Sequence, residues 1–299
     1  MASTTPFAGA RLAIIGTGAM AEAMLAGMLH RGVVQPGQVI CSHPRAQRRE
    51  ELQREHGVAT TPANAEAAAG ADVVLLAIKP QMLPEVMPEL RTTLDGEQLL
   101  VSIIAGASTR ALRAGLDHPA IVRCMPNTPA QIGQGVTVWY ATAEVTGEGK
   151  GRTRSMLGAL GREFEVHDER QVAMATAVSG TGPTYIFLFI EALVDAAVHL
   201  GFPRHVAREL VLDTMQGSAA FALSSGHHVA QLRDMVTSPG GTSAEALYQL
   251  ERGRLRTVVS DAVWAAFERT EQLERLLEEG PAPPPSQRRT TNGERGRNR

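Results

Sequence analysis

A turn of small residues joins an apolar run to a helical pattern near the N-terminus. The run is residues 11–15 (RLAII), the helical pattern covers 19–30, and the turn reads Gly16-Thr17-Gly18-Ala19-Met20-Ala21. The first glycine permits a tight turn, the second allows close backbone approach to a phosphate, and Ala21 lets the helix pack on the strand. A pyrophosphate there would meet free N–H groups and the positive end of the helix dipole. A plain tight turn is the alternative, but the strand, turn and helix together predict a dinucleotide site.

Strand-like and helical segments alternate through the first half of the chain. We expect helices at 19–30 and 44–56, and strands at 11–15, 38–41, 71–77, 99–104 and 120–125. The run at 71–77 is apolar apart from Asp72, as in a parallel strand that is covered on both faces. The pattern predicts an α/β fold whose N-terminal domain, residues 1–168, is a Rossmann-type doubly wound parallel sheet.

Helical patterns alone occupy the second half. They cover 169–200, 203–224, 229–236, 243–252 and 254–277, and Pro203 is expected in the first turn of its helix. The segment 186–199 is apolar nearly all round, so it must be buried on several sides. We therefore expect a C-terminal all-α dimerisation domain at 169–279, in a homodimer or a higher assembly of dimers.

The overall composition excludes several classes of partner. The formal net charge is −2, so neither nucleic acid nor an anionic membrane is expected as a partner. Cys41 and Cys124 lack metal-ligand spacing and are interpreted as buried thiols, and no metal is expected. Without a basic, apolar leader or a long uncharged apolar run, we expect a cytoplasmic protein with no membrane-spanning helix. Residues 280–299 lack large apolar side chains and are expected to form a disordered tail.

The end of the second expected strand discriminates between cofactors. Enzymes that use NAD usually place an acid there, whereas this chain has Cys41-Ser42-His43-Pro44-Arg45. Ser42 and Arg45 suit a 2′-phosphate, so NADP is favoured, with NADPH preferred and NADH still open. The role of His43 is left open, and we interpret Arg48 and Arg49 as solvated charges on a helix.

Four further motifs occur in order along the chain. They are Ala77-Ile78-Lys79-Pro80, the RCMPNTP run that starts at Arg123, the SGTGP run that starts at Ser179, and the TSPGGTS run that ends at Ser243. With the glycine turn, they resemble pyrroline-5-carboxylate reductase, the last enzyme of proline biosynthesis, over about residues 11–277. The resemblance implies hydride transfer from NAD(P)H to the C=N bond of Δ1-pyrroline-5-carboxylate, giving L-proline.

The resemblance also implies a set of site residues. Arg45 is added to this set for its charge, and Asn127 for its position beyond the carboxyl end of a strand. The expected cofactor contacts are Gly16, Thr17, Gly18, Ala19, Met20, Ala21, Ser42, Arg45, Asn64, Ala77, Ile78, Lys79, Pro80, Ala105, Gly106 and Asn127. The expected substrate contacts are Ser179, Gly240, Gly241, Thr242 and Ser243.

The glycine loop near residue 240 suits a carboxylate on physical grounds alone. Gly240 and Gly241 let consecutive N–H groups point at one spot, and a helix expected from Ser243 adds its dipole. The alternative is purely structural, because residues 242–245 (TSAE) resemble a capping box. Ser179 and Asn127 have similar alternatives, as part of a helix start and as a turn residue.

Reduction of a protonated imine needs positioning more than acid–base groups. The family places a threonine hydroxyl near the ring nitrogen, and the matching residue here is Ser243, which we expect to be catalytic. A reductase of a related cyclic imine and a catalytically silent NADP-binding relative are the alternatives. A β-hydroxyacid-type dehydrogenase is disfavoured, since residues 169–277 contain no lysine.

Overall fold

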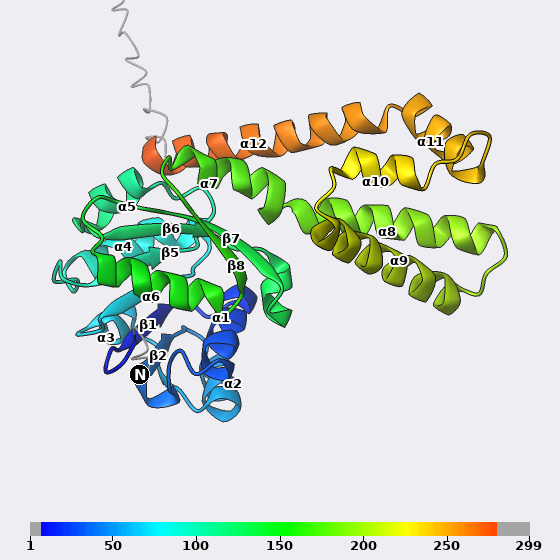
Figure 1. The fold of residues 1–299 in the computed structure, drawn as a ribbon. Coiled ribbons are helices and arrows are strands. Elements are labelled where there is room, and N and C mark those ends of the chain that lie inside the picture. Colours follow the sequence, from blue (N-terminus) through cyan, green and yellow to red (C-terminus); the bar gives the residue numbers. More distant parts are fainter. Residues whose placement is uncertain (1–6, 280–299) are drawn as a thin grey trace, which may run out of the picture.

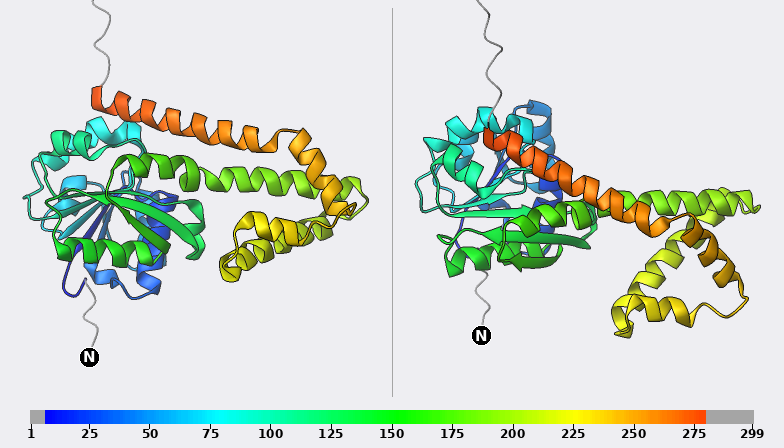
Figure 2. Two further views of the ribbon diagram at one scale, coloured as in Figure 1. Left: turned by 45° about the horizontal axis from the view of Figure 1, so that its top comes forward. Right: turned by 90° about the horizontal axis from the view of Figure 1, so that it is seen from above.

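The computed structural model describes residues 7–279 and has two visibly different parts. An α/β part holds the N-terminal half of the chain, and a helical arm extends away from it (Figures 1 and 2). The segment expected to be a tail, residues 280–299, lies outside the described residues.

One eight-stranded sheet forms the centre of the α/β part, in the order β3-β2-β1-β4-β5-β6-β7-β8. Neighbouring strands run parallel except β6 and β7, which pair antiparallel. The predicted α/β fold class is confirmed, although β3, β7 and β8 were not expected. The bounds are β1 Leu12–Ile15, β2 Val39–Ser42, β3 Ala59–Thr61, β4 Val73–Leu76, β5 Leu99–Ser102, β6 Ile121–Met125, β7 Gly135–Ala141 and β8 Gly161–Val166.

Helices cover both faces of the sheet. The α-helices are α1 Ala19–His30, α2 Ala46–His56, α3 Asn64–Ala68, α4 Leu83–Arg91, α5 Thr109–Leu116 and α6 Gly147–Gly158, and 3-10 helices lie at Pro36–Gln38, Pro80–Met82 and Thr128–Ile132. Because side chains alternate along a strand, Leu12 and Ile14 join the core under α1, α2 and α6, while Ala13 and Ile15 join the core under α3, α4 and α5. Cys41 and Cys124 are buried, as expected.

The helical part follows directly after β8. Its elements are α7 Arg170–Ala175, a π-helix Thr176–Gly180, α8 Gly182–His199, α9 Arg204–Ser225, α10 Val229–Met235, α11 Thr242–Arg252 and α12 Leu255–Glu279. The helical pattern expected over 169–200 is therefore broken by the π-helix. Pro203 caps α9 rather than lying in its first turn, because its ψ of 139° is extended.

Large apolar side chains remain exposed along the arm of a single chain. Phe187 and Leu188 on α8 are 62% and 66% exposed, and Trp264 on α12 is 61% exposed. Contrary to expectation, one stretch, Arg170–His199, is long and apolar enough to cross a membrane by length and composition. This is weak evidence, since a helix that packs on a second protein chain has the same composition.

Candidate active site

The turn after β1 requires its first glycine for two reasons. Gly16 has a φ of +83°, and a Cβ at this position would lie 2.6 Å from Cγ2 of Ile78. The Gly16 N–H also donates to the carbonyl of Ser42, at 3.2 Å, which holds the turn against β2. Gly16 therefore acts through backbone geometry and close packing.

The second glycine opens the N-terminus of α1. Gly18 is the N-cap, its φ of −75° is ordinary, and no side chain caps the helix. A Cβ on Gly18 would meet nothing within 4 Å. The first-turn N–H groups of α1 thus face open space beside the turn, which is the arrangement that binds a phosphate.

The side chain of Thr17 is a second feature that suits an anion at this turn. Its side chain is buried, and its hydroxyl oxygen has no hydrogen-bond partner within residues 7–279. An unsatisfied buried hydroxyl costs about 1–3 kcal/mol, so such groups usually meet a ligand or water. The orphaned hydroxyl and the uncapped helix end together fit the pyrophosphate of a dinucleotide.

The end of β2 is built around a hydrogen-bonded chain. The buried Ser42 hydroxyl donates to Oδ1 of Asn64 at 2.7 Å, and Nδ2 of Asn64 donates to Glu89 at 3.0 Å. Glu89 also accepts from the N–H of Ala65 at 3.0 Å. Glu89 was not expected from the sequence, because an acid on an amphipathic helix such as α4 carries no signal. Direct contact of Ser42 and Asn64 with a cofactor remains a prediction.

The three arginines near the end of β2 differ in their surroundings. Arg48 was interpreted as a solvated charge, and this is wrong. It is mostly covered and forms ion pairs with Glu22 at 2.6 Å and with Glu51 at 3.2 Å. Arg49 donates to the carbonyls of residues 43 and 44, both at 2.8 Å. Arg45 is exposed, and within the described chain its guanidinium takes part in no ion pair, so it is available to an anion.

His43 lies beside these arginines. Its Nδ1 accepts from the backbone N–H of Arg45 at 3.2 Å. Partial burial lowers the pKa of His43, and the neighbouring charge of Arg45 lowers it further. A neutral imidazole is therefore favoured here, which leaves Arg45 as the exposed cation at the end of β2.

On the other side of the expected cofactor site, which we call the trough, lie the segments that follow β4 and β5. Ile78 packs over the glycine turn, and Lys79 is exposed at the start of a 3-10 helix. Gly106 has a φ of +76°, and a Cβ there would lie 3.0 Å from Cβ of Leu273. Gly106 thus allows α12 to approach the sheet closely.

Asn127 and Ser179 meet beyond the carboxyl end of β6. The Asn127 amide donates to the Ser179 carbonyl at 3.1 Å and accepts from the N–H of Val136 at 2.9 Å. The Ser179 hydroxyl donates to the carbonyl of Ala175 within the π-helix, at 3.0 Å. The structure therefore brings together a residue expected at the cofactor and one expected at the substrate.

The glycine loop before α11 leaves a helix end uncapped. Helix α11 begins at Thr242 with Gly241 as N-cap, and no side chain caps it. The predicted capping box at residues 242–245 is therefore wrong, because the helix starts one residue too early for Thr242 to be the cap. Gly240 has a φ of +70°, and a Cβ on Gly241 would lie 2.5 Å from Oγ of Ser238. The positive φ of Gly240 favours glycine there. The Gly241 N–H donates to the Ser238 carbonyl at 3.0 Å and the Ala244 N–H to the Gly241 carbonyl at 3.1 Å, which leaves the N–H groups of Thr242 and Ser243 for a carboxylate.

A single chain does not bring all of these residues together. The glycine turn lies at the end of β1 in the α/β part, whereas α11 lies at the far end of the helical arm (Figures 1 and 2). The loop that precedes α11 is therefore remote from the glycine turn of its own chain.

Both parts of the chain match known protein families. Residues 169–273 match the family model for pyrroline-5-carboxylate reductase dimerisation, and residues 11–106 match that for NADP oxidoreductase, coenzyme F420-dependent. The pyrroline-5-carboxylate reductase of Synechocystis sp. is 39% identical, over 88% of this chain and 98% of that protein. The Pseudomonas aeruginosa enzyme of the same name is 40% identical, over 89% of this chain and 98% of that protein.

Solved structures agree with these relatives. The pyrroline-5-carboxylate reductase of Coxiella burnetii superposes with a TM-score of 0.82 at 35% identity, covering 89% of this chain and 99% of that one. The Plasmodium falciparum pyrroline carboxylate reductase, solved with NADP bound, also has a TM-score of 0.82, at 30% identity, covering 89% of this chain and 98% of that one. The chain therefore belongs to the pyrroline-5-carboxylate reductase family.

Proposed function

We propose that this protein reduces Δ1-pyrroline-5-carboxylate to L-proline with NADPH, as the final step of proline biosynthesis. The observation that carries the proposal is the presence of two uncapped helix ends behind glycine turns, one in each part of the chain. One suits a pyrophosphate and the other a small carboxylate. Curated reductases of this name share 39–40% identity with the chain along 98% of their own length.

The cofactor contacts are proposed on the contents of the α/β part. The turn at residues 16–21 would hold the pyrophosphate, with the orphaned Thr17 hydroxyl beside it. Arg45 would pair with the 2′-phosphate, since it is an exposed cation and no acid stands at residues 42–45. This favours NADPH over NADH. When bound, the nicotinamide supplies the hydride.

The substrate contacts are proposed at the N-terminus of α11. The N–H groups of Thr242 and Ser243 would bind the carboxylate, and the Ser243 hydroxyl would orient the imine nitrogen and retain its proton. The carbon of a protonated imine is already electrophilic, so the protein chiefly has to hold it in place. The hydride then bonds to carbon, the C=N electron pair moves to nitrogen, and a secondary amine results.

A homodimer would complete the site. In one chain the α11 loop is remote from the glycine turn, and apolar side chains such as Phe187 and Leu188 are exposed along the arm. We propose that the arms of two subunits pack on each other, so that the α11 loop of each subunit reaches the trough of the other. The match of residues 169–273 to a dimerisation model supports this. Assembly of dimers into larger particles and a cytoplasmic location are further proposals.

Each proposed domain has its own role. Residues 1–168 would bind the cofactor, and residues 169–279 would dimerise and bind the substrate. The start of the dimerisation match at residue 169 supports this boundary.

One assay tests the proposed function. NADPH oxidation is followed after addition of Δ1-pyrroline-5-carboxylate and then of other cyclic imines. NADP reduction is followed after addition of hydroxyacids. Rapid oxidation with the first substrate alone is expected. A faster rate with another imine would reassign the substrate, and no reaction with any of them, despite NADPH binding, would identify a silent relative.

A further inference from the structure

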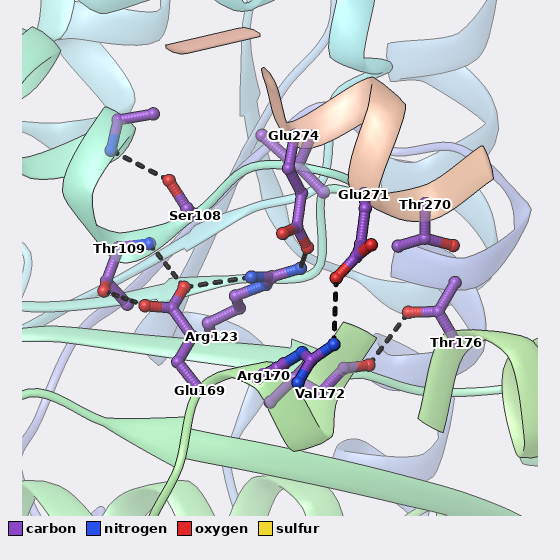
Figure 3. Close-up of polar contacts among 12 residues, drawn as sticks. Ser108, Thr109, Arg123, Glu169, Arg170, Val172, Thr176, Thr270, Glu271 and Glu274 are labelled. Atoms are coloured by element: carbon purple, nitrogen blue, oxygen red, sulfur yellow. Dashed lines mark hydrogen bonds and ion pairs between the residues drawn. The ribbon is translucent and has the colours of Figure 1, made fainter. Parts of the chain in front are cut away.

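A buried arginine in β6 is shared by two carboxylates from distant parts of the chain. The Arg123 side chain is only 4% exposed, and it pairs with Glu169 at 2.9 Å and with Glu274 (Figure 3). Glu169 is the N-cap of α7, and Glu274 lies in the last turns of α12. Arg123, Glu169 and Glu274 are not among the residues assigned to the cofactor or the substrate, although α12 packs on Gly106 at Leu273.

Glu169 and a second acid of α12 also contact the N-terminus of α5. Glu169 accepts from the N–H of Thr109 at 2.7 Å, at the start of α5. One turn further along α12, Glu278 accepts from the Ser108 hydroxyl at 2.7 Å. The first helix and the last helix of the helical part are thus held to the same patch of the α/β part, formed by β6 and the N-terminus of α5.

These two helices form the stem of the arm. Helices α7 and α12 pack on each other, α7 packs on β6 and β7, and α12 packs on α5. Both run from the α/β part toward the arm (Figures 1 and 2). From Glu274 to the start of α12 at Leu255 the helix spans about 28 Å, so a tilt of about 5° at the base would move its far end by about 2.5 Å.

A buried ion pair can often be replaced by apolar side chains with little loss of stability, so the geometry that it imposes is the feature to explain. The planar, forked guanidinium reaches two carboxylates in fixed directions, which a single apolar contact or a lysine cannot do. Arg123 therefore links both helices of the stem to β6 in one defined geometry.

We propose that Arg123, with Glu169 and Glu274, is a positioning group for the reaction, because it sets the angle at which each subunit carries its α11 loop to the other subunit's trough. This inference rests on the proposed function and the proposed dimer. Arg123 acts at a distance, through the stem, and it does not touch substrate or cofactor.

The test compares variants that change the link between the stem and the sheet with one that changes only a contact between the two stem helices. Glu274→Gln and Arg123→Lys weaken the link to the α/β part, and Arg123→Met removes it. Arg170→Gln is the matched control, since Arg170 joins α7 to Glu271 of α12 at 3.5 Å without reaching the sheet. Each variant is assayed as the intact dimer for NADPH affinity, kcat and KM for the imine, and melting temperature.

Misplacement of a substrate by about 1 Å can cost about a hundredfold in rate. We expect Glu274→Gln to lower kcat/KM for the imine about five- to thirtyfold, with Arg123→Met lower still and Arg123→Lys intermediate. NADPH affinity should stay within about twofold of wild type, and Arg170→Gln should match wild type in all parameters. If Glu274→Gln and Arg123→Lys keep wild-type kcat/KM and only melt earlier, the ion pairs are merely structural and the inference is refuted.

A distance measurement separates this inference from the proposed reaction. A spin label at Glu85→Cys, on the exposed surface of α4, gives one label per subunit, and the distance between the two labels reports the stem angle. Glu274→Gln should shift or broaden that distance, whereas Arg170→Gln should leave it unchanged. A wild-type protein that fails to reduce the imine would overturn the proposed function, and the label distances would still decide whether Arg123 sets the angle. An unchanged distance in Glu274→Gln would refute the inference.

Discussion

The two glycines of the turn after β1 should respond differently to the same substitution. Gly16 is held at a φ of +83°, and an added Cβ would lie 2.6 Å from the Ile78 side chain. Gly18 has a φ of −75°, and an added Cβ would meet no atom within 4 Å. Gly16→Ala should therefore damage the fold, whereas Gly18→Ala should damage only the binding of the cofactor.

The expected magnitudes follow from these geometries. A left-handed backbone costs an alanine about 1–2 kcal/mol, and overpacking costs about 1–3 kcal/mol. We expect Gly16→Ala to lower the free energy of unfolding by about 2–4 kcal/mol and Tm by about 5–10 °C. A methyl group at Gly18 would block one charge-assisted hydrogen bond to a phosphate, worth about 1.5–3 kcal/mol, and so raise the Kd for NADPH about ten- to hundredfold.

Thermal unfolding without cofactor and titration of NADPH by fluorescence measure the two effects separately. Gly18→Ala should melt within about 2 °C of wild type, because its backbone suits alanine. Wild-type NADPH affinity in Gly18→Ala would refute the assignment of the pyrophosphate to this turn. A wild-type Tm in Gly16→Ala would refute the packing argument.

Three further predictions concern the arm, the substrate and pH. Ser243→Ala should lower kcat about ten- to a hundredfold with NADPH affinity kept, as measured by steady-state kinetics and titration; an unchanged kcat would remove Ser243 from the mechanism. Phe187→Asp, in the exposed apolar face of α8, should yield monomers in light scattering, and an intact dimer would show that this face is not the interface. Burial lowers the pKa of His118, so below about pH 6.5 the unfolded chain binds a proton that the folded chain does not. Stability should therefore fall as the pH drops below that value, and less steeply in His118→Gln; equal slopes in melting temperature would exclude His118.

Much of the fold was predictable from local patterns. Runs such as 71–77 are mostly apolar because parallel strands are covered on both faces, and α1 was placed at its observed bounds, Ala19–His30. Strand β8, Gly161–Val166, was not predicted, because its three charged residues, Arg162, Glu163 and Glu165, resemble an exposed segment. The antiparallel pairing of β6 and β7 likewise depends on tertiary contacts that no local pattern encodes.

The site was predictable where backbone geometry needs a particular residue type. Gly16 and Gly240 have a positive φ, Gly241 lies close to Ser238, and Gly18 stands at an open helix end. Pairings between distant residues were not predictable. Arg48 was misjudged because its partner Glu22 lies on another helix, and nothing in the RCMPNTP motif indicates that Arg123 meets Glu274, 151 residues away.

A crystal structure of the dimer with NADP and a proline-like carboxylate tests the central claim most directly. The account predicts that the carboxylate lies at the N-terminus of α11, within hydrogen-bond distance of the backbone N–H groups of Thr242 and Ser243. It also predicts that the ring of that ligand faces the nicotinamide held by the other subunit. A carboxylate bound elsewhere, with the α11 loop remote from the nicotinamide in both subunits, would contradict the account.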